Sequence, residues 1–183
     1  MDNGAGSYRR FLDGDESAFN EIMNELFRGL VFFINRYVHD THAAEDIAID
    51  TFSDLVVHKS RYNFKVTLKT YLYTVGRSRA LDYIKHRRVI DFVELSEAKK
   101  LADESKILEE TVLADERKRA VNAAMEKLSE DMGVAVHLIY FEEMTYEEAA
   151  KVMKKNRKQV DNLLYRAKKE LRIILGEDGE LLL

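Results

Sequence analysis

The sequence predicts an all-α protein built of two small helical domains, and three observations carry this prediction. The chain has no proline, and apolar residues recur at helical spacing nearly throughout. β-Branched residues do not alternate with polar ones over any long window, which argues against strands. Residues 89–116 contain nine acidic and three basic residues, with apolar residues only scattered among them, so this stretch is expected to connect two packed lobes.

Length and composition exclude several classes of protein. The 183 residues suit one medium domain or two small ones, and 46% hydrophobic with 34% charged residues is a globular composition. The absence of cysteine excludes disulfides, thiol catalysis and cysteine-ligated zinc. No apolar run reaches the roughly 18 residues of a membrane span, and the N-terminus does not resemble a signal peptide. We therefore expect a cytoplasmic protein without a membrane segment.

The first domain is expected over residues 8–88, after a short lead over residues 1–12 that frays at its start. Three helices are predicted over residues 13–38, 42–59 and 68–88, with a loop over residues 60–67. Asp40 or Thr41 can cap the second helix, and Thr67 can cap the third. An acidic linker over residues 89–111 follows, and its composition predicts little buried surface.

The second domain is expected over residues 112–175. Helices are predicted over residues 117–128 and 130–142, followed by a helical hairpin from Met144 to Leu171. Thr145 with Glu148 and Asn156 with Gln159 have the spacing of reciprocal caps at the two helix starts of this hairpin. The turn between them lacks glycine, so Lys154, Lys155 or Asn156 must adopt a left-handed conformation, and asparagine does so most easily.

The second helix of the hairpin combines an apolar stripe with a basic outer surface. Between Lys151 and Arg172 there are nine basic and two acidic residues, a local charge of +7 in a chain of net charge −4. A basic second helix is typical of a helix-turn-helix, in which that helix lies in the DNA major groove. An ordinary hairpin with a solvated charged face is the alternative. The candidate DNA-binding residues are Arg157, Lys158, Asp161, Asn162, Tyr165, Arg166, Lys168 and Lys169.

A second candidate surface combines aromatic and basic residues. Tyr62, Phe64, Tyr71 and Tyr73 precede a run over residues 77–88 that holds five basic residues and one acidic residue. Aromatic rings beside cations suit stacking on unpaired bases and neutralisation of their phosphates. Any one of these aromatic residues could equally belong to the core.

The sequence offers little support for an enzyme. It contains no glycine-rich phosphate loop, nucleophile elbow or paired-carboxylate motif. His39, His42, Glu45 and Asp46 lie close together, but no second cluster completes a metal-ligand set, and the two acids suit the first turn of a helix. We expect no catalytic residues, no metal and no cofactor.

Three stretches resemble one family, the extracytoplasmic-function sigma factors of bacterial RNA polymerase. They are AAEDIAIDTF (43–52), TLKTYLYTVGRSRALDYIKHRR (67–88) and the segment 128–172 with its YEEAA and YRA motifs. The resemblance covers about residues 13–175, with the motifs in the family's order. The chain departs from the family pattern at Ile49, Tyr71 and Ser78, where glutamine, tryptophan and asparagine are usual.

The resemblance implies that the chain binds core RNA polymerase and promoter DNA, and that an anti-sigma factor is a candidate regulator. When it is not bound to these partners, the chain is expected to be a monomer. The residues that would bind core polymerase are Asp46, Ile47, Ile49, Asp50 and Phe52. The −10 element would be held by Tyr62, Asn63, Phe64, Tyr71, Tyr73, Arg77, Ser78, Lys85, Arg87 and Arg88. The predicted DNA-binding residues of the last helix would read the −35 element.

Two other functions remain open on the sequence alone. A stand-alone helix-turn-helix regulator would share the last domain and use the first to sense a ligand or to dimerise. A helical adaptor would bind a protein partner and no DNA. The net charge of −4 favours the sigma-factor interpretation over the regulator, because isolated affinity for DNA should be poor.

Overall fold

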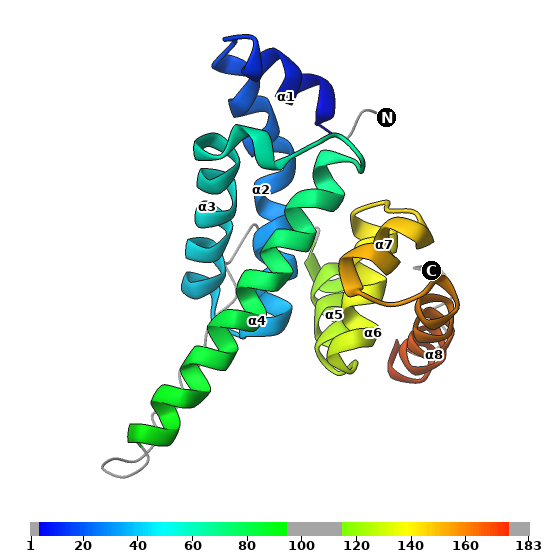
Figure 1. The fold of residues 1–183 in the computed structure, drawn as a ribbon. Helices are drawn as coiled ribbons and strands as arrows, with labels where there is room; N and C mark the ends of the chain where they lie inside the picture. The colour runs from blue at the N-terminus through cyan, green and yellow to red at the C-terminus, as the bar shows by residue number, and fades with distance from the viewer. Residues whose placement is uncertain (1–3, 95–114, 176–183) are drawn as a thin grey trace. The chain divides into compact units, whose positions relative to one another are not determined.

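The computed structural model describes residues 4–94 and 115–175, with side chains over residues 4–89 and 121–175. Every regular element within these residues is a helix, so the all-α prediction is confirmed (Figure 1). No helix in the described ranges is both long enough and apolar enough to cross a bilayer.

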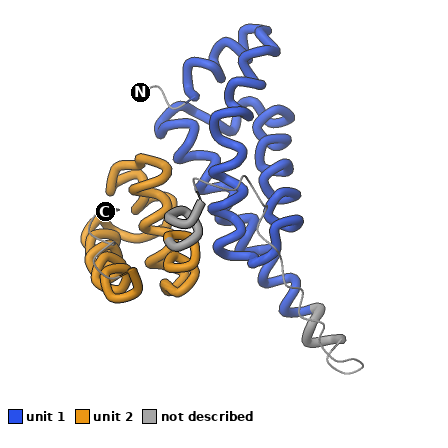
Figure 2. Tube along the Cα trace, turned by 180° about the vertical axis from the view of Figure 1, so that it is seen from behind, with its two compact units in different colours: residues 1–106 blue, residues 107–183 orange. Residues whose placement is uncertain are grey.

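The chain divides into two compact units, Met1–Lys106 and Ile107–Leu183 (Figure 2). The first unit contains α1 (Ala5–Leu12), α2 (Ser17–Val38), α3 (Thr41–Val57), a 3-10 turn (Lys59–Arg61) and α4 (Leu68–Glu94). Helix α2 packs against α1, α3 and α4, and its Ile22, Leu26 and Leu30 are fully buried. Each such side chain contributes about 1.5–3 kcal/mol relative to an exposed position, so α2 forms the core of this unit.

The starts of α3 and α4 follow from local capping. Asp40 accepts a hydrogen bond from the Ala43 N–H at 3.0 Å, and Thr67 Oγ1 accepts one from the Thr70 N–H at 3.2 Å. Both caps were among those predicted. Helix α4 extends to Glu94, past its predicted end, because neither glycine nor proline interrupts the sequence there. The first part of the predicted linker is therefore helical, and residues 95–111 lie outside the described residues.

The expected lead before the first domain is instead a helix, α1. Tyr8 is fully buried and Phe11 nearly so, and the Phe11 ring lies 5.1 Å from that of Phe19. The two aromatic residues are three positions apart, so one helical turn directs both toward the unit's interior. Gly4, at φ 84°, starts the helix beside Leu68. Tertiary packing thus orders residues 5–12 of the expected lead, whereas its start, where fraying was expected, falls at residues 1–3, outside the described residues.

The second unit consists of α5 (Asp115–Glu126), α6 (Glu130–Val136), a π-helical turn (His137–Phe141), α7 (Tyr146–Met153) and α8 (Arg157–Leu175). The predicted break at Leu128–Ser129 is present, and Ser129 is the N-cap of α6. The predicted helix over residues 130–142 changes to π-helical geometry at His137, whose ring stacks on Phe141 at 5.8 Å. Helix α8 packs against α5, α6 and α7.

The turn between α7 and α8 corrects one prediction. Lys154, and not Asn156, occupies the left-handed region, with φ 53° and ψ 42°. Asn156 caps α8 through its side chain, a role that requires an extended backbone. The left-handed position therefore falls two residues earlier, at the C-cap of α7, where the Lys154 N–H bonds back to the Lys151 carbonyl at 3.2 Å.

Candidate nucleic-acid interface

Reciprocal side-chain caps close both helix starts of the α7–α8 hairpin. Glu148 N–H donates to Thr145 Oγ1 at 3.2 Å, and Thr145 N–H donates to the Glu148 carboxylate at 2.9 Å. At α8, Gln159 N–H donates to Asn156 Oδ1 at 2.9 Å, and Asn156 N–H donates to Gln159 Oε1 at 2.8 Å. Both predicted caps are confirmed, and together they fix the direction in which α8 leaves the turn.

Helix α8 buries its apolar stripe and exposes its charged surface. Val160, Leu164, Ala167 and Leu171 are buried. The predicted DNA-binding side chains lie on the remaining faces, and all are exposed except the half-buried Lys168: Arg157, Lys158, Asp161, Asn162, Tyr165, Arg166, Lys168 and Lys169. An exposed basic face on a helix whose other face is anchored has the form of a helix that enters a DNA groove.

Two cations of this surface are oriented by neighbours. Arg157 Nε lies 3.4 Å from the Glu147 carboxylate, and its guanidinium lies 6.0 Å from the centre of the Tyr146 ring. Lys168 Nζ lies 5.2 Å from the centre of the Tyr140 ring. The ion pair is exposed, so its contribution to stability is small. It directs Arg157 along α7, while Lys168 points toward the π-helical turn.

The predicted aromatic cluster spans the loop between α3 and α4 and the start of α4, but two of its members are core residues. Tyr73 is fully buried, with its ring 4.9 Å from that of Phe33. Tyr62 is 3% exposed and packs against the rings of Phe64 and Tyr71 at 4.6 and 5.2 Å. A buried ring has no open face for a base, so Tyr62 and Tyr73 support this surface from beneath and do not form it.

The exposed tip of the same loop is Asn63, Phe64 and Lys65. Asn63 Oδ1 accepts a hydrogen bond from Lys65 N–H at 3.1 Å, which closes a tight turn. Phe64 is half-buried and has φ 60°, a left-handed conformation that is uncommon for a bulky residue. Such strain persists only where the surroundings impose it and is concentrated at functional sites.

Sequence reasoning missed Asp54, near the end of α3, which gathers three basic side chains beside this loop. Its carboxylate is 13% exposed and lies 2.6 and 2.8 Å from Arg61 Nη1, 3.7 Å from Arg79 Nη2 and 3.6 Å from His58 Nε2. These partners come from the end of α3, the 3-10 turn and α4. Asp54 and His58 are four residues apart, so a helix is expected to bring them together, but the contacts of Asp54 with Arg61 and Arg79 depend on tertiary structure.

The basic residues of α4 continue from this loop. Ser78, Lys85, Arg87 and Arg88 are exposed, and Arg77 is half-buried with its guanidinium 5.9 Å from the centre of the Tyr37 ring. Arg87 Nη1 also lies 3.7 Å from Asp40 at the start of α3. The structure thus gathers the loop tip and the basic run of α4 on one unit, whereas the α8 surface belongs to the other.

The predicted polymerase-binding residues of α3 divide between two faces. Asp46, Ile49 and Asp50 are exposed on successive turns, with Ile49 49% exposed. Ile47 and Phe52 are buried in the first unit and cannot contact a partner directly. The period of 3.6 residues places Ile47 about 100° away from Asp46, so the exposed apolar residue beside the two carboxylates is Ile49.

The described residues hold no group of three or more His, Asp or Glu side chains arranged to bind a metal ion. His39 ends α2 in the left-handed region, and Asp40 uses its carboxylate to cap α3.

Two family models match the chain, in order along the sequence. The description "Sigma-70 region 2" matches residues 14–89, and "Sigma-70, region 4" matches residues 118–171. The ECF RNA polymerase sigma factor SigM of Bacillus subtilis is 24% identical over 166 residues, covering 87% of this chain and 93% of its own. The chain belongs to the extracytoplasmic-function sigma factors. It therefore acts in promoter-specific transcription initiation with core RNA polymerase, and members of its family are initiation factors that do not catalyse a reaction.

Other relatives agree with this assignment. The RNA polymerase sigma-H factor of Pseudomonas aeruginosa is 26% identical over 168 residues, covering 86% of each chain. Among solved structures, the sigma factor RpoE in complex with the anti-sigma factor NepR from Bartonella quintana superposes with a TM-score of 0.64 at 22% identity, over 87% of this chain and 98% of that one. CnrH in complex with the cytosolic domain of CnrY gives 0.60 at 18% identity over 96% of each chain. At these identities the structures show a shared fold.

The electrostatics around Asp54 can be tested through Tyr71. Burial raises the pKa of the Tyr71 phenol, and the Asp54 carboxylate raises it further, whereas Arg61 and Arg79 lower it. In Asp54→Asn the pKa of Tyr71 should therefore fall, because one of the two causes that raise it is removed while Arg61 and Arg79 remain. The pKa of Tyr8 is raised to about 12 by burial and by the neighbouring Tyr71 and Tyr62, so it belongs to the same cluster and is followed alongside that of Tyr71. An NMR titration of ¹³C-labelled tyrosine measures the pKa values of both phenols. An unchanged pKa of Tyr71 in Asp54→Asn would contradict this arrangement.

Proposed function

We propose that the two units divide promoter recognition, with the first binding core polymerase and the −10 element and the second reading the −35 element. The observation that carries this proposal is the α8 surface: a capped, anchored helix whose first two turns expose Lys158, Asp161 and Asn162. Side chains at the start of a recognition helix reach base edges, and those further along meet phosphates.

The −10 element, in this proposal, meets the loop tip and α4. Phe64 and Tyr71 are half-buried, so each keeps an open part of its ring for stacking on an unpaired base. Asn63 beside them offers both a hydrogen-bond donor and an acceptor. The basic side chains of α4 follow the backbone of the same strand: the half-buried Arg77 and the exposed Lys85, Arg87 and Arg88.

The polymerase contact is proposed for the exposed face of α3. Asp46 and Asp50 lie one turn apart on one face of α3, and the exposed side chain of Ile49 lies beside them, so two carboxylates adjoin an apolar residue. Such a face complements a basic helical surface with an apolar seam. Ile47 and Phe52 hold α3 in place from beneath.

The remaining features of the proposal concern organisation and regulation. Residues 8–88 and 112–175 would act as separate domains, joined by the acidic stretch over residues 89–111. RpoE and CnrH were each solved with a protein partner, and we propose that this chain is likewise held by an anti-sigma factor until it is needed. The free protein would be a cytoplasmic monomer that needs no cofactor.

Base reading by α8 is tested by two variants that change one side chain each. Asn162→Ala should flatten the preference at one or two −35 positions, since a good base contact gives about 1–3 kcal/mol of discrimination. Lys169→Ala should weaken all promoters alike and reduce the salt slope by about one phosphate's worth. Initiation from a −35 library at several salt concentrations measures both. Uniform loss in Asn162→Ala, or a new sequence preference in Lys169→Ala, would refute this orientation of α8.

Polymerase docking is tested by reversing one charge. Removing one partner of an interfacial charge pair costs about 2–5 kcal/mol, so Asp46→Arg should weaken binding to core polymerase at least about tenfold. Glu25→Arg, an exposed reversal on α2, is the matched control and should bind normally. Binding is measured by fluorescence titration, with circular dichroism to establish equal helix content. Wild-type affinity in Asp46→Arg would reject this face.

A further inference from the structure

Helix α1 lies before residue 14, where the match to sigma-70 region 2 begins, yet it is tightly integrated in the first unit. Contacts of Tyr8 and Arg9, in the middle of α1, join it to the end of α3 and the α3–α4 loop, and a separate polar network joins it to α2. This placement raises the question of what α1 contributes to the proposed −10 surface.

The first contact is made by the hydroxyl of Tyr8. It lies 3.0 Å from the carbonyl oxygen of Leu55 and 3.2 Å from that of Lys59, in position to donate to either. Leu55 is in the last turn of α3, where backbone carbonyls have no partner within the helix. Lys59 begins the 3-10 turn that follows. The hydroxyl therefore fixes the point at which the helix ends and the loop begins.

The other contacts reach the tip of the loop. The Tyr8 ring lies 5.5 Å from that of Tyr62 in an edge-on arrangement and 6.1 Å from that of Phe64. The guanidinium of the exposed Arg9 lies 4.9 Å from the centre of the Phe64 ring. Tyr8 thus supports Phe64 from within the unit, and Arg9 places a cation over the ring of the same residue.

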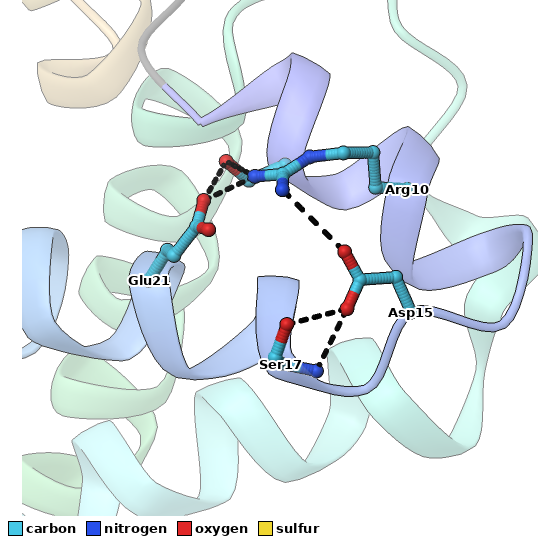
Figure 3. A network of polar contacts seen from close by, with 5 residues as sticks. Arg10, Asp15, Ser17 and Glu21 are labelled. Carbon is cyan, nitrogen blue, oxygen red and sulfur yellow. Dashed lines mark hydrogen bonds and ion pairs between the residues drawn. The ribbon is translucent and has the colours of Figure 1, made fainter.

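Helix α1 is itself held by α2 and the turn before it (Figure 3). Arg10 contacts the carboxylates of Asp15, at 3.4 Å, and Glu21, which also accepts a hydrogen bond from Ser7 at 2.9 Å. Asp15 in turn accepts a hydrogen bond from the Ser17 N–H at 3.1 Å. The two neighbouring arginines therefore differ, because Arg10 is engaged with acids while Arg9 lies over Phe64.

We propose that α1 is a positioning element of the −10 surface, with Tyr8 the positioning residue. Its hydroxyl sets the start of the loop, its ring sets the strained conformation of Phe64, and Arg9 adds a cation beside the stacking position. A loop held in its binding conformation before DNA arrives loses less conformational entropy on binding. This inference rests on the proposed assignment of the −10 element to the loop tip.

The central variant is Tyr8→Phe, which keeps the buried ring and removes only the hydroxyl. The assay combines the variant with core polymerase and a promoter duplex that carries 2-aminopurine in the −10 element, whose fluorescence reports open-complex formation. We expect the rate of open-complex formation to fall about tenfold, because a buried acceptor is left without its donor. Base preference at one −10 position should flatten, while affinity for core polymerase and preference at −35 stay as in the wild type. Tyr140→Phe, which removes the hydroxyl of an exposed tyrosine in the second unit and keeps its ring, should match the wild type.

Two further variants separate the possible outcomes. Arg9→Gln changes an exposed side chain and should weaken the same −10 preference about two- to fivefold, the scale of an exposed cation–π contact.

Phe64→Ala reports on the proposed function itself. If Phe64→Ala abolishes the −10 preference while Tyr8→Phe behaves as wild type, the inference is wrong and the function stands. If Tyr8→Phe lowers core binding and all promoters equally, its role is structural and the inference is also wrong. If Phe64→Ala retains the full preference, the −10 assignment fails and takes the inference with it.

Discussion

Helix ends must find partners for the backbone groups that the helix leaves unpaired, and this requirement shapes both candidate DNA-binding surfaces. In the second unit, reciprocal caps at Thr145 and Asn156 satisfy the first N–H groups of α7 and α8 and so define the hairpin angle. In the first unit, the carbonyl at the end of α3 is satisfied by the hydroxyl of Tyr8. The two solutions differ in range, since the caps are local and Tyr8 lies 47 residues from Leu55.

That difference explains what the sequence could predict. Caps three residues apart, the apolar stripe of α8 and the start of α4 at Thr67 follow from local spacing, and all are present in the structure. The helical nature of α1 and the burial of Tyr62 and Tyr73 depend on partners distant in sequence, which no single-sequence pattern encodes. The family motifs gave the function because they preserve order and spacing over most of the chain. They gave no information on side chains outside them, such as Tyr8.

Charge has a different role in each part of the protein. The carboxylate of Asp54 gathers Arg61 and Arg79 beside the loop, whereas Asp46 and Asp50 remain exposed on the same helix. A chain of net charge −4 with one strongly basic helix has little non-specific attraction to DNA when alone. Under the proposed division of promoter recognition, specific binding would depend on polymerase, which would hold both units against the promoter at once and so raise their effective concentration. This dependence separates a sigma factor from a stand-alone regulator that uses the same hairpin.

The most direct test is run-off transcription with core polymerase and a promoter pool randomised over the −10 and −35 elements, sequenced before and after selection. The account predicts that transcripts appear only when the chain and core polymerase are combined, and that both elements are enriched. The chain alone should bind the enriched duplex weakly, with a steep dependence on salt. Tight, sequence-specific binding by the free chain, with no effect of the chain on transcription by core polymerase, would contradict the account and favour a stand-alone regulator.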